Sequence, residues 1–457
     1  MRRRLTSIMA LLITLLCSAC GVQTTAAPQQ TPDTPLLQTA ATMPSHAPVA
    51  TPALAPTQPV VPVTLLAYVH AGDVWISELP GAAPRRVSSD GEASAPRWSP
   101  SGAWLAFCQN EQLQVVPRDG GATQAFGPCS GTWLPTRDEL AFATDSSTTI
   151  VDVASGRRRA VAYHVDAWNP DGTAFAYVDL ALSGALDTAN APERTTSLWR
   201  AAADGSTPQE LFSPGTPAPY GLVLAGWYNN SILFWSDPQF SASLLADGVP
   251  LHSIPAQGGS EREIVPWMLA HPDFLAISPD GTRIAATEGG NRQTWTNKHI
   301  VTVDMASGTR TQITGNAVAA FSPTWSPDGK QLAYVAGPDV GSVGGGEAAQ
   351  KGMEQRHIWV MNADGSDNRQ ITTGDTFYDE RPRWTADGAH LVFVRVNDQQ
   401  QPSLWTVRPD GSGLEQISDS LGNITQTQEA DFGYYGYHNW DQFFDVWQPS
   451  ANRAFSN

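Results

Sequence analysis

Polar and aromatic side chains that could bind a partner gather in a few irregular stretches of this sequence. Mixed acids, arginine, histidine and aromatic rings suit recognition of a polar partner such as a peptide, a protein loop or a glycan. For any single residue a solvated loop position is the simpler interpretation, whereas the set as a whole favours binding. One group consists of His164, Asp166, His271, Asp273, Tyr378, Asp379, Glu380 and Arg381, and a second of Glu288, Arg292 and Trp295.

Motifs for catalysis are scarce. The sequence contains no Gly-x-Ser-x-Gly turn that would present a serine nucleophile and no His-Glu-x-x-His pair that would hold zinc. The stretch 362–367 looks superficially like a calcium loop but lacks the distal glutamate, and the glycine-rich run 341–346 lacks the lysine of a phosphate-binding loop. We therefore expect no catalytic residue, no metal and no cofactor.

A repeated unit separates the candidate residues. Its signature is an aromatic or aliphatic residue, then Ser-Pro-Asp-Gly or a near variant, then an apolar strand; copies start at Trp98, Trp168, Ile277, Trp325 and Trp384. Proline fixes φ at the first corner and glycine accepts a left-handed conformation, so the signature predicts a hairpin. A third strand, a second Asp-Gly turn and a fourth strand follow, as in 357–372. Four antiparallel strands per repeat predict one blade of a β-propeller.

The positions of the repeats predict the number of blades. Before the first unit, the strands 65–69, 73–77 and 85–87 look like the last three strands of a blade, and 443–450 resembles the missing first strand. We therefore predict an all-β propeller over residues 63–450 with eight blades, or with six or seven as the alternative. Its carboxy-terminal strand joins the amino-terminal blade and closes the ring. Units begin near Trp98, Trp133, Trp168, Trp227, Ile277, Trp325 and Trp384, of which the Trp227 unit lacks Pro-Asp-Gly.

The order of strands in a blade divides the loops between two faces. The tight Asp-Gly turns share one face, while the second-to-third loops and the connections between blades share the other. All the candidate residues above fall on this second, loop-rich face, around the mouth of a central channel, and loops on a rigid scaffold commonly carry binding. The aromatic stretch 431–440 either caps the channel mouth and stacks on a ligand, or packs as a tail on the rim.

The amino-terminal residues predict export. Arg2 to Arg4 and the apolar stretch 5–16 precede Cys20, a pattern typical of a bacterial lipoprotein signal over 1–20 with Cys20 lipidated. An ordinary secretory signal cut near Ala19 is the alternative. Residues 21–62, rich in proline, threonine and alanine, predict a disordered tether, and 451–457 a tail. We expect the protein on the outer side of the cytoplasmic membrane or in the periplasm, held at the membrane only by its lipid.

Charge and cysteine content narrow the partners and the chemistry. The formal net charge of −17 argues against nucleic acid, because phosphate binding needs a basic surface. Cys108 and Cys129 are the two cysteines outside the signal. In an oxidising compartment they predict a disulfide, with two buried thiols as the alternative.

The repeats resemble a known family. The stretches 325–334 and 357–366 look like the PD40, or WD40-like, repeat of TolB-type β-propellers, a resemblance that covers roughly 65–420. TolB proteins also carry an amino-terminal α/β domain, in whose place this sequence has the tether. Prolyl-oligopeptidase-type enzymes have similar propellers next to a hydrolase domain, for which this chain lacks room. Some PD40-like propellers resemble oligogalacturonate lyases, which hold a divalent metal with histidines.

The predicted function follows from these points. We expect a monomeric, non-enzymatic binding or scaffold protein of the cell envelope that engages an envelope protein, a peptide or a glycan through the loop-rich face. The alternative is a metal-dependent polysaccharide-active enzyme. Scattered histidines are its only support: His164, His252, His271, His299, His357, His390 and His438.

Overall fold

The computed structural model describes residues 63–79, 83–183, 193–238, 240–241, 245–342, 344–422 and 434–447. These belong to the compact unit 60–457. The predicted signal with Cys20, the whole of the tether 21–62, the tail and part of the aromatic stretch 431–440 lie outside the described residues. No helix within the described ranges is both long and apolar enough to cross a membrane.

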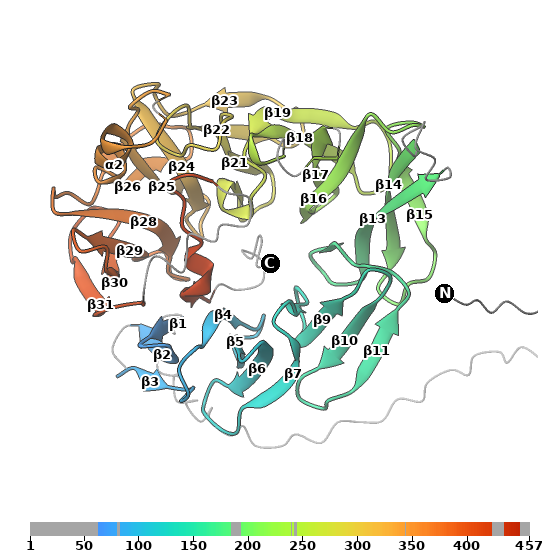
Figure 1. Cartoon of the computed structure of the whole chain (residues 1–457), viewed down its shortest axis with the longest axis horizontal. Coiled ribbons are helices and arrows are strands. Elements are labelled where there is room, and N and C mark those ends of the chain that lie inside the picture. Colours follow the sequence, from blue (N-terminus) through green and yellow to red (C-terminus); the bar gives the residue numbers. More distant parts are fainter. Residues whose placement is uncertain are drawn as a thin grey trace, which may run out of the picture. The chain divides into compact units, whose positions relative to one another are not determined.

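Within the described residues, strands β1 to β32 form eight blades of four antiparallel strands, numbered here from the amino terminus (Figure 1). Blade 1 consists of β32 (Phe444–Val446), β1 (Thr64–His70), β2 (Asp73–Leu79) and β3 (Arg85–Arg86). Blade 2 consists of β4 (Ser94–Trp98), β5 (Trp104–Gln109), β6 (Gln112–Pro117) and β7 (Gln124–Pro128). Blade 3 consists of β8 (Thr132–Trp133), β9 (Glu139–Ala143), β10 (Thr148–Asp152) and β11 (Arg158–Val161). Blade 4 consists of β12 (Ala167–Trp168), β13 (Ala174–Ser183), β14 (Glu193–Ala202) and β15 (Gln209–Phe212).

The second half of the propeller follows the same plan. Blade 5 consists of β16 (Tyr220–Tyr228), β17 (Ser231–Pro238), β18 (Val249–Pro255) and β19 (Arg262–Met268). Blade 6 consists of β20 (Leu275–Ile277), β21 (Arg283–Glu288), β22 (His299–Asp304) and β23 (Arg310–Gln312). Blade 7 consists of β24 (Val318–Trp325), β25 (Gln331–Pro338), β26 (His357–Asn362) and β27 (Arg369–Gln370). Blade 8 consists of β28 (Phe377–Trp384), β29 (Leu391–Asn397), β30 (Pro402–Val407) and β31 (Glu415–Ser418).

Short helices interrupt this pattern in the described residues. Helix η1 (Pro272–Phe274) lies between blades 5 and 6, α2 (Glu347–Met353) between β25 and β26, and η3 (Trp440–Gln442) just before β32. Blades 5 and 6 are joined into one eight-stranded sheet by the pairing of Met268 with Glu288. The sequence predicts the all-β propeller and its four-stranded blades, and the structure confirms both.

The repeated Ser-Pro-Asp-Gly stretch forms the hairpin turn that its residue types predict. In blade 6, Ser278 Oγ donates to Asp280 Oδ1 at 2.6 Å and accepts from the backbone N–H of Arg283 at 2.9 Å. Gly281 has φ of 67°, a left-handed conformation that most side chains disfavour. The same bonds recur in blade 7 around Ser326 and Asp328, so these residues build the blades.

The tryptophan of the repeat joins neighbouring blades. Trp133, Trp325 and Trp384 each end the first strand of a blade, and each donates its indole N–H to a carbonyl of the preceding blade. The acceptors are the carbonyl oxygens of Arg97, Ala276 and Thr324, at 3.1, 3.2 and 3.2 Å. A buried indole N–H needs such an acceptor, so the tryptophan both packs against the preceding blade and fixes its orientation.

The two ends of the described unit meet in blade 1. β32 pairs antiparallel with β1, Leu66 opposite Val446 and Tyr68 opposite Phe444. Residues of blade 8, such as Val392 and Leu404, share one buried cluster with the β1 strand. That the carboxy-terminal strand closes and stabilises the ring stays a prediction.

Candidate functional site

A cavity of about 930 Å³ lies at the centre of the propeller. Its wall is formed by the first strands of blades 2 to 5, β4, β8, β12 and β16, and by part of the carboxy-terminal segment 434–447. The lining runs from Pro100 and Pro135 in the hairpin turns to Ala143 and His164 on the loop-rich face. The cavity therefore follows the length of the inner strands, and its volume is typical of ligand sites.

Blade 3 and its connection to blade 4 supply a titratable pair at the loop-rich end of the cavity. His164 Nε2 lies 3.4 Å from Asp166 Oδ1, and His164 Nδ1 lies 2.7 Å from the carbonyl oxygen of Thr144. Loss of solvent raises the pKa of Asp166, against the lowering effects of the Val178 amide and of His164. His164 and Asp166, which the sequence predicts for the ligand face, therefore lie together and line the cavity.

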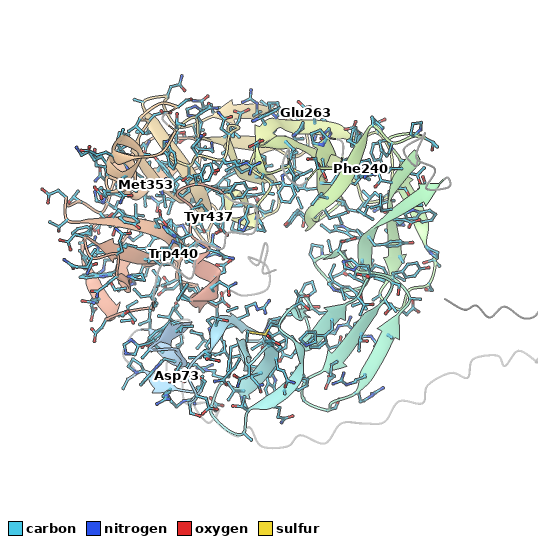
Figure 2. All side chains as sticks on the ribbon, viewed as in Figure 1. Asp73, Phe240, Glu263, Met353, Tyr437 and Trp440 are labelled. Atoms are coloured by element: carbon cyan, nitrogen blue, oxygen red, sulfur yellow. A yellow bond between two sulfur atoms is a disulfide. The ribbon has the colours of Figure 1, made fainter. Side chains whose placement is uncertain are left out.

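The other side of the channel is occupied by the carboxy-terminal segment. Figure 2 shows Tyr437 and Trp440 on the inner side of the sheets, and both side chains are buried. Tyr435 and Gly436 are bound through their carbonyl oxygens by Thr294, and Gly436 also by Arg356. Part of the predicted aromatic stretch is thus an internal element that contacts the channel walls.

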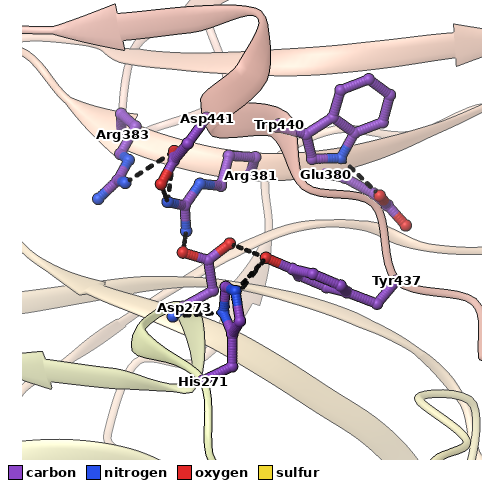
Figure 3. A network of polar contacts seen from close by, with 8 residues as sticks. All are labelled: His271, Asp273, Glu380, Arg381, Arg383, Tyr437, Trp440 and Asp441. Carbon is purple, nitrogen blue, oxygen red and sulfur yellow. Dashed lines mark hydrogen bonds and ion pairs between the residues drawn. The ribbon is translucent and has the colours of Figure 1, made fainter. Parts of the chain in front are cut away.

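Figure 3 shows the ionic contacts that hold this segment. Arg381 lies between two carboxylates, with Nη1 2.5 Å from Asp273 Oδ1 and Nη2 2.6 Å from Asp441 Oδ1. Arg383 also reaches Asp441, at 3.3 Å. Burial alone would lower the pKa of Arg381, but Asp273 and Asp441 outweigh it and raise that pKa. Desolvation would raise the pKa of Asp441, yet Arg381 and Arg383 hold it well below its usual range.

Two further contacts belong to the network in Figure 3. Tyr437 donates its hydroxyl to Asp273 Oδ2 at 2.6 Å, and Trp440 donates its indole N–H to Glu380 Oε2 at 2.7 Å. Glu380 also accepts from Arg356 at 2.8 Å. Burial and then the Asp273 charge raise the pKa of Tyr437 well above its ordinary value, so its hydroxyl stays a donor. We call Asp273, Glu380, Arg381, Tyr437, Trp440 and Asp441 the anchoring network.

Of the remaining predicted residues, His271 also lines the cavity, and the others lie outside its lining. Asp379 is fully buried between Arg395 and His357, and Glu288 pairs with Arg310. Tyr378 to Arg381 belong to β28 itself, so the inner strand is longer than the sequence suggests. Arg292 pairs with Asp247, and Trp295, in the same loop as Arg292, is buried. His271 lines the cavity and lies near Tyr437.

A proline-linked bulge recurs in three inner strands, and the turn-based repeat does not predict it. β4, β24 and β28 each break register before their tryptophan, at Ala95-Pro96, Ser322-Pro323 and Arg381-Pro382. The residue before each proline has φ of 50°, 53° and 56° respectively. Proline lacks the N–H that a regular ladder would use, so it suits a bulge. The shared pattern x-Pro-x-Trp was the available signal for these positions.

The disulfide lies at the wall of the cavity. Cys108 of β5 and Cys129 after β7 are bonded within blade 2, and both line the cavity. Arg97 donates to the carbonyl oxygen of Cys129 at 2.9 Å. Burial lowers the pKa of Arg97 below its ordinary value, although Asp445 and Asp441 act to raise it. Arg97, Asp441 and Asp445 make this part of the wall charged, and none of them was expected from sequence.

No group of three or more histidine, cysteine, aspartate or glutamate side chains is placed to hold a metal ion in the part of the chain that the structure describes. Single histidines instead have structural contacts. His357 bonds to Asp379 and to the carbonyl oxygen of Gly374, and His252 to Glu261 and Ser236.

Comparison with known proteins supports the fold. No protein-family model matches the sequence. The chain is 30% identical over 101 residues to dipeptidyl-peptidase 5 of Porphyromonas endodontalis, a match over 22% of this chain and 13% of that protein. The structure is similar to dipeptidyl peptidase 4 of Porphyromonas gingivalis, with TM-score 0.52 and 10% identity over 78% of this chain and 59% of that one. A putative TolB from Agrobacterium tumefaciens matches over 84% of this chain and 96% of its own, with 15% identity and TM-score 0.34.

The four-stranded blades, together with the similar fold of the dipeptidyl peptidase structure, define the class of protein as a β-propeller. The matched region spans about an eighth of the curated relative and less than two thirds of the dipeptidyl peptidase structure, so their activities are not transferred to this chain.

Proposed function

We propose that this chain is a non-enzymatic binding protein of the cell envelope that takes a polypeptide segment or a glycan through the loop-rich face of its propeller. The observation that carries the proposal is the cavity of about 930 Å³, which extends from that face between the inner strands of four blades. Its wall combines aromatic side chains with a few charged groups, which is the usual composition of a ligand site.

The carboxy-terminal segment favours a polypeptide as the ligand. The opposite wall of the same channel already binds residues 434–447 through buried aromatic rings, carbonyl contacts and an aspartate between two arginines. Arg97 and the His164–Asp166 pair offer similar donors and acceptors along the cavity. The pattern around Cys20 supports an exported, lipid-anchored location for this activity.

A cavity-filling substitution tests the proposal. Ala143 lines the cavity at the loop-rich end of β9 and is exposed, so Ala143→Trp narrows the entrance without removing a core contact. Ala154 is exposed in the turn between β10 and β11 of the same blade, on the opposite face, and Ala154→Trp is the matched control. Peptides selected from a random display library, and glycans from an envelope glycan array, would be titrated by calorimetry.

We expect Ala143→Trp to weaken binding of the selected ligand at least tenfold and Ala154→Trp to leave it within twofold. Equal affinities for both variants would place the ligand elsewhere. If neither library yields a ligand, or if a selected ligand is chemically converted, the non-enzymatic binding role is wrong.

A further inference from the structure

Two aromatic side chains stand out because they are exposed. Among the aromatic residues that the structure describes, Trp267 and Tyr435 are the two large exposed ones, at 50% and 55% of their surface. They are 168 residues apart in sequence, yet both contact the loop between β21 and β22, residues 289–298. Two exposed aromatic residues attached to one loop indicate an interaction site, because most large rings are buried.

Glycines hold the Trp267 ring in place. A β-carbon added to Gly290 would lie 1.5 Å from Trp267 Nε1, and one added to Gly248 would lie 2.8 Å from it. The edge of the indole therefore rests on bare backbone from blades 5 and 6, which leaves much of the ring open to solvent. The backbone carbonyl of Trp267 accepts from the N–H of Gly289 at 2.7 Å, which fixes the strand beneath the ring.

Tyr435 is attached to the same loop from the carboxy-terminal segment. Its N–H donates to the carbonyl oxygen of Arg292 at 2.8 Å, and its own carbonyl oxygen accepts from Thr294 N–H at 3.1 Å. An ion pair lies on the same loop, with Arg292 Nε donating to Asp247 Oδ1 at 2.6 Å. Asp247 is also tied to the loop by a bond from Asn291 N–H to its carbonyl oxygen at 2.8 Å.

A buried lysine makes the loop rigid. Lys298 is fully buried, and its Nζ donates to the carbonyl oxygens of Gly290, Asn291 and Thr296 at 2.8, 3.1 and 3.2 Å. Burial lowers the pKa of Lys298 to about 7, although the Asp339 charge raises it. The carbonyl oxygens favour the protonated amine, because it donates three bonds. The residues that carry the two rings are thus preorganised, which reduces the entropy lost on binding.

We propose that Trp267 and Tyr435, with the Arg292–Asp247 pair, form a platform for a neutral glycan, here called the aromatic platform. Ring faces take the C–H surface of sugar rings, and the guanidinium and carboxylate can bond to hydroxyl groups. The net charge of −17 disfavours an anionic polymer. Beside Trp267 the edge of β19 is already used, because Met268 is paired with Glu288 and the Trp267 carbonyl oxygen accepts from Gly289, which disfavours an added peptide strand at this point.

The aromatic platform is distinct from the cavity, since neither aromatic ring, Arg292 nor Asp247 lines it. The proposal rests on the proposed binding role of the loop-rich face but not on the cavity. Failure of one can therefore be told from failure of the other: Ala143→Trp should not change glycan binding at the platform.

Calorimetric titration of the folded propeller with cellohexaose and chitohexaose tests the platform, with polygalacturonate as the anionic comparison. We expect Trp267→Ala and Tyr435→Ala each to weaken hexasaccharide binding about five- to tenfold. Tyr435→Phe keeps the ring and should bind within threefold of the parent. Leu180→Ala, at another exposed apolar residue, is the control and should have no effect.

Gly290→Ala provides a test that keeps both rings. The added methyl group cannot coexist with the present position of the indole, so the ring must move and hexasaccharide binding should weaken at least threefold. Thermal melting of each variant checks that the fold is retained. The proposal is overturned if neither hexasaccharide binds, if polygalacturonate binds more tightly, or if the two alanine variants bind like the parent.

Discussion

At the residue scale, the predicted ligand-face side chains divide according to what they contact. His164 and Asp166 line the open cavity, whereas Asp273, Glu380 and Arg381 bind the chain's own carboxy-terminal segment. The sequence places all five on one face from the order of strands alone. It does not reveal their partners, because Tyr437 and Asp441 are 60 to 164 residues away and reach them only in the folded ring.

A substitution at Tyr437 tests how much the anchoring network contributes to stability. Tyr437→Phe removes the hydroxyl that donates to Asp273 and leaves a buried carboxylate oxygen without that donor. We expect the free energy of unfolding to fall by about 1.5–3 kcal/mol, the usual range for a hydrogen bond to a charged group. Urea unfolding followed by fluorescence would measure it. Tyr435→Phe, at an exposed tyrosine two positions away, should change it by less than about 0.5 kcal/mol; equal losses would contradict the network.

At the element scale, the local parts of the blade were predictable. The turn depends on residues within five positions of one another, as the Ser278, Asp280 and Arg283 contacts show, so residue types suffice. Each inner-strand bulge contains one proline, two positions after the last regular pair, and a repeat defined by its turn sequence does not include that position. The union of blades 5 and 6 rests on one residue pair, Met268 and Glu288, for which the sequence has no marker.

The turn aspartates make the blades sensitive to acid. The Ser278 hydroxyl and then the Thr282 N–H hold the pKa of Asp280 below its ordinary value, and the Thr173 hydroxyl and N–H lower the pKa of Asp171. A carboxyl with a lowered pKa in the folded state stabilises the fold fully above the unfolded pKa, about 3.9, and loses this effect as pH falls through the folded value. We therefore expect the melting temperature to drop below about pH 4.

The Ser278→Ala variant tests whether the Asp280 carboxylate causes this sensitivity to acid. The variant loses the hydroxyl bond to Asp280, so its free energy of unfolding should be about 1 kcal/mol lower at pH 7, with a smaller difference at pH 3. Part of the loss persists in acid because Ser278 also accepts from Arg283 N–H. Calorimetric melting at both pH values, with Ser260→Ala at an exposed serine as control, measures it. A difference that does not depend on pH would exclude the carboxylate as the cause.

At the scale of the whole domain, a count of the strands in each repeat predicts that the two ends of the chain complete one blade. The number of blades follows from the same count, because each unit needs four strands to bury its faces. What the sequence could not supply is the path of residues 434–443 through the channel before β32. That path is set by contacts with blades 6 to 8, which become neighbours only once the propeller has formed.

Truncation tests whether β32 stabilises the ring. A chain that ends at residue 440 loses the β32 pairing with β1, the buried Phe444 and the Asp441 ion pairs, while a chain that ends at 447 keeps all three. We expect the first to unfold or to melt at least 10 °C below the second, because a propeller without this pairing exposes a strand edge and part of its core. Differential scanning calorimetry would measure both.

The Phe444→Ala variant tests the packing of β32 without shortening the chain. The side chain is buried in the cluster that blade 1 shares with blade 8, so its removal should lower the free energy of unfolding by about 3–5 kcal/mol. The backbone pairing of β32 with β1 is kept in this variant, as are the contacts of Asp441. If the chain ending at 440 and the Phe444→Ala variant both melt within 2 °C of the parent, the prediction that β32 stabilises the propeller is wrong.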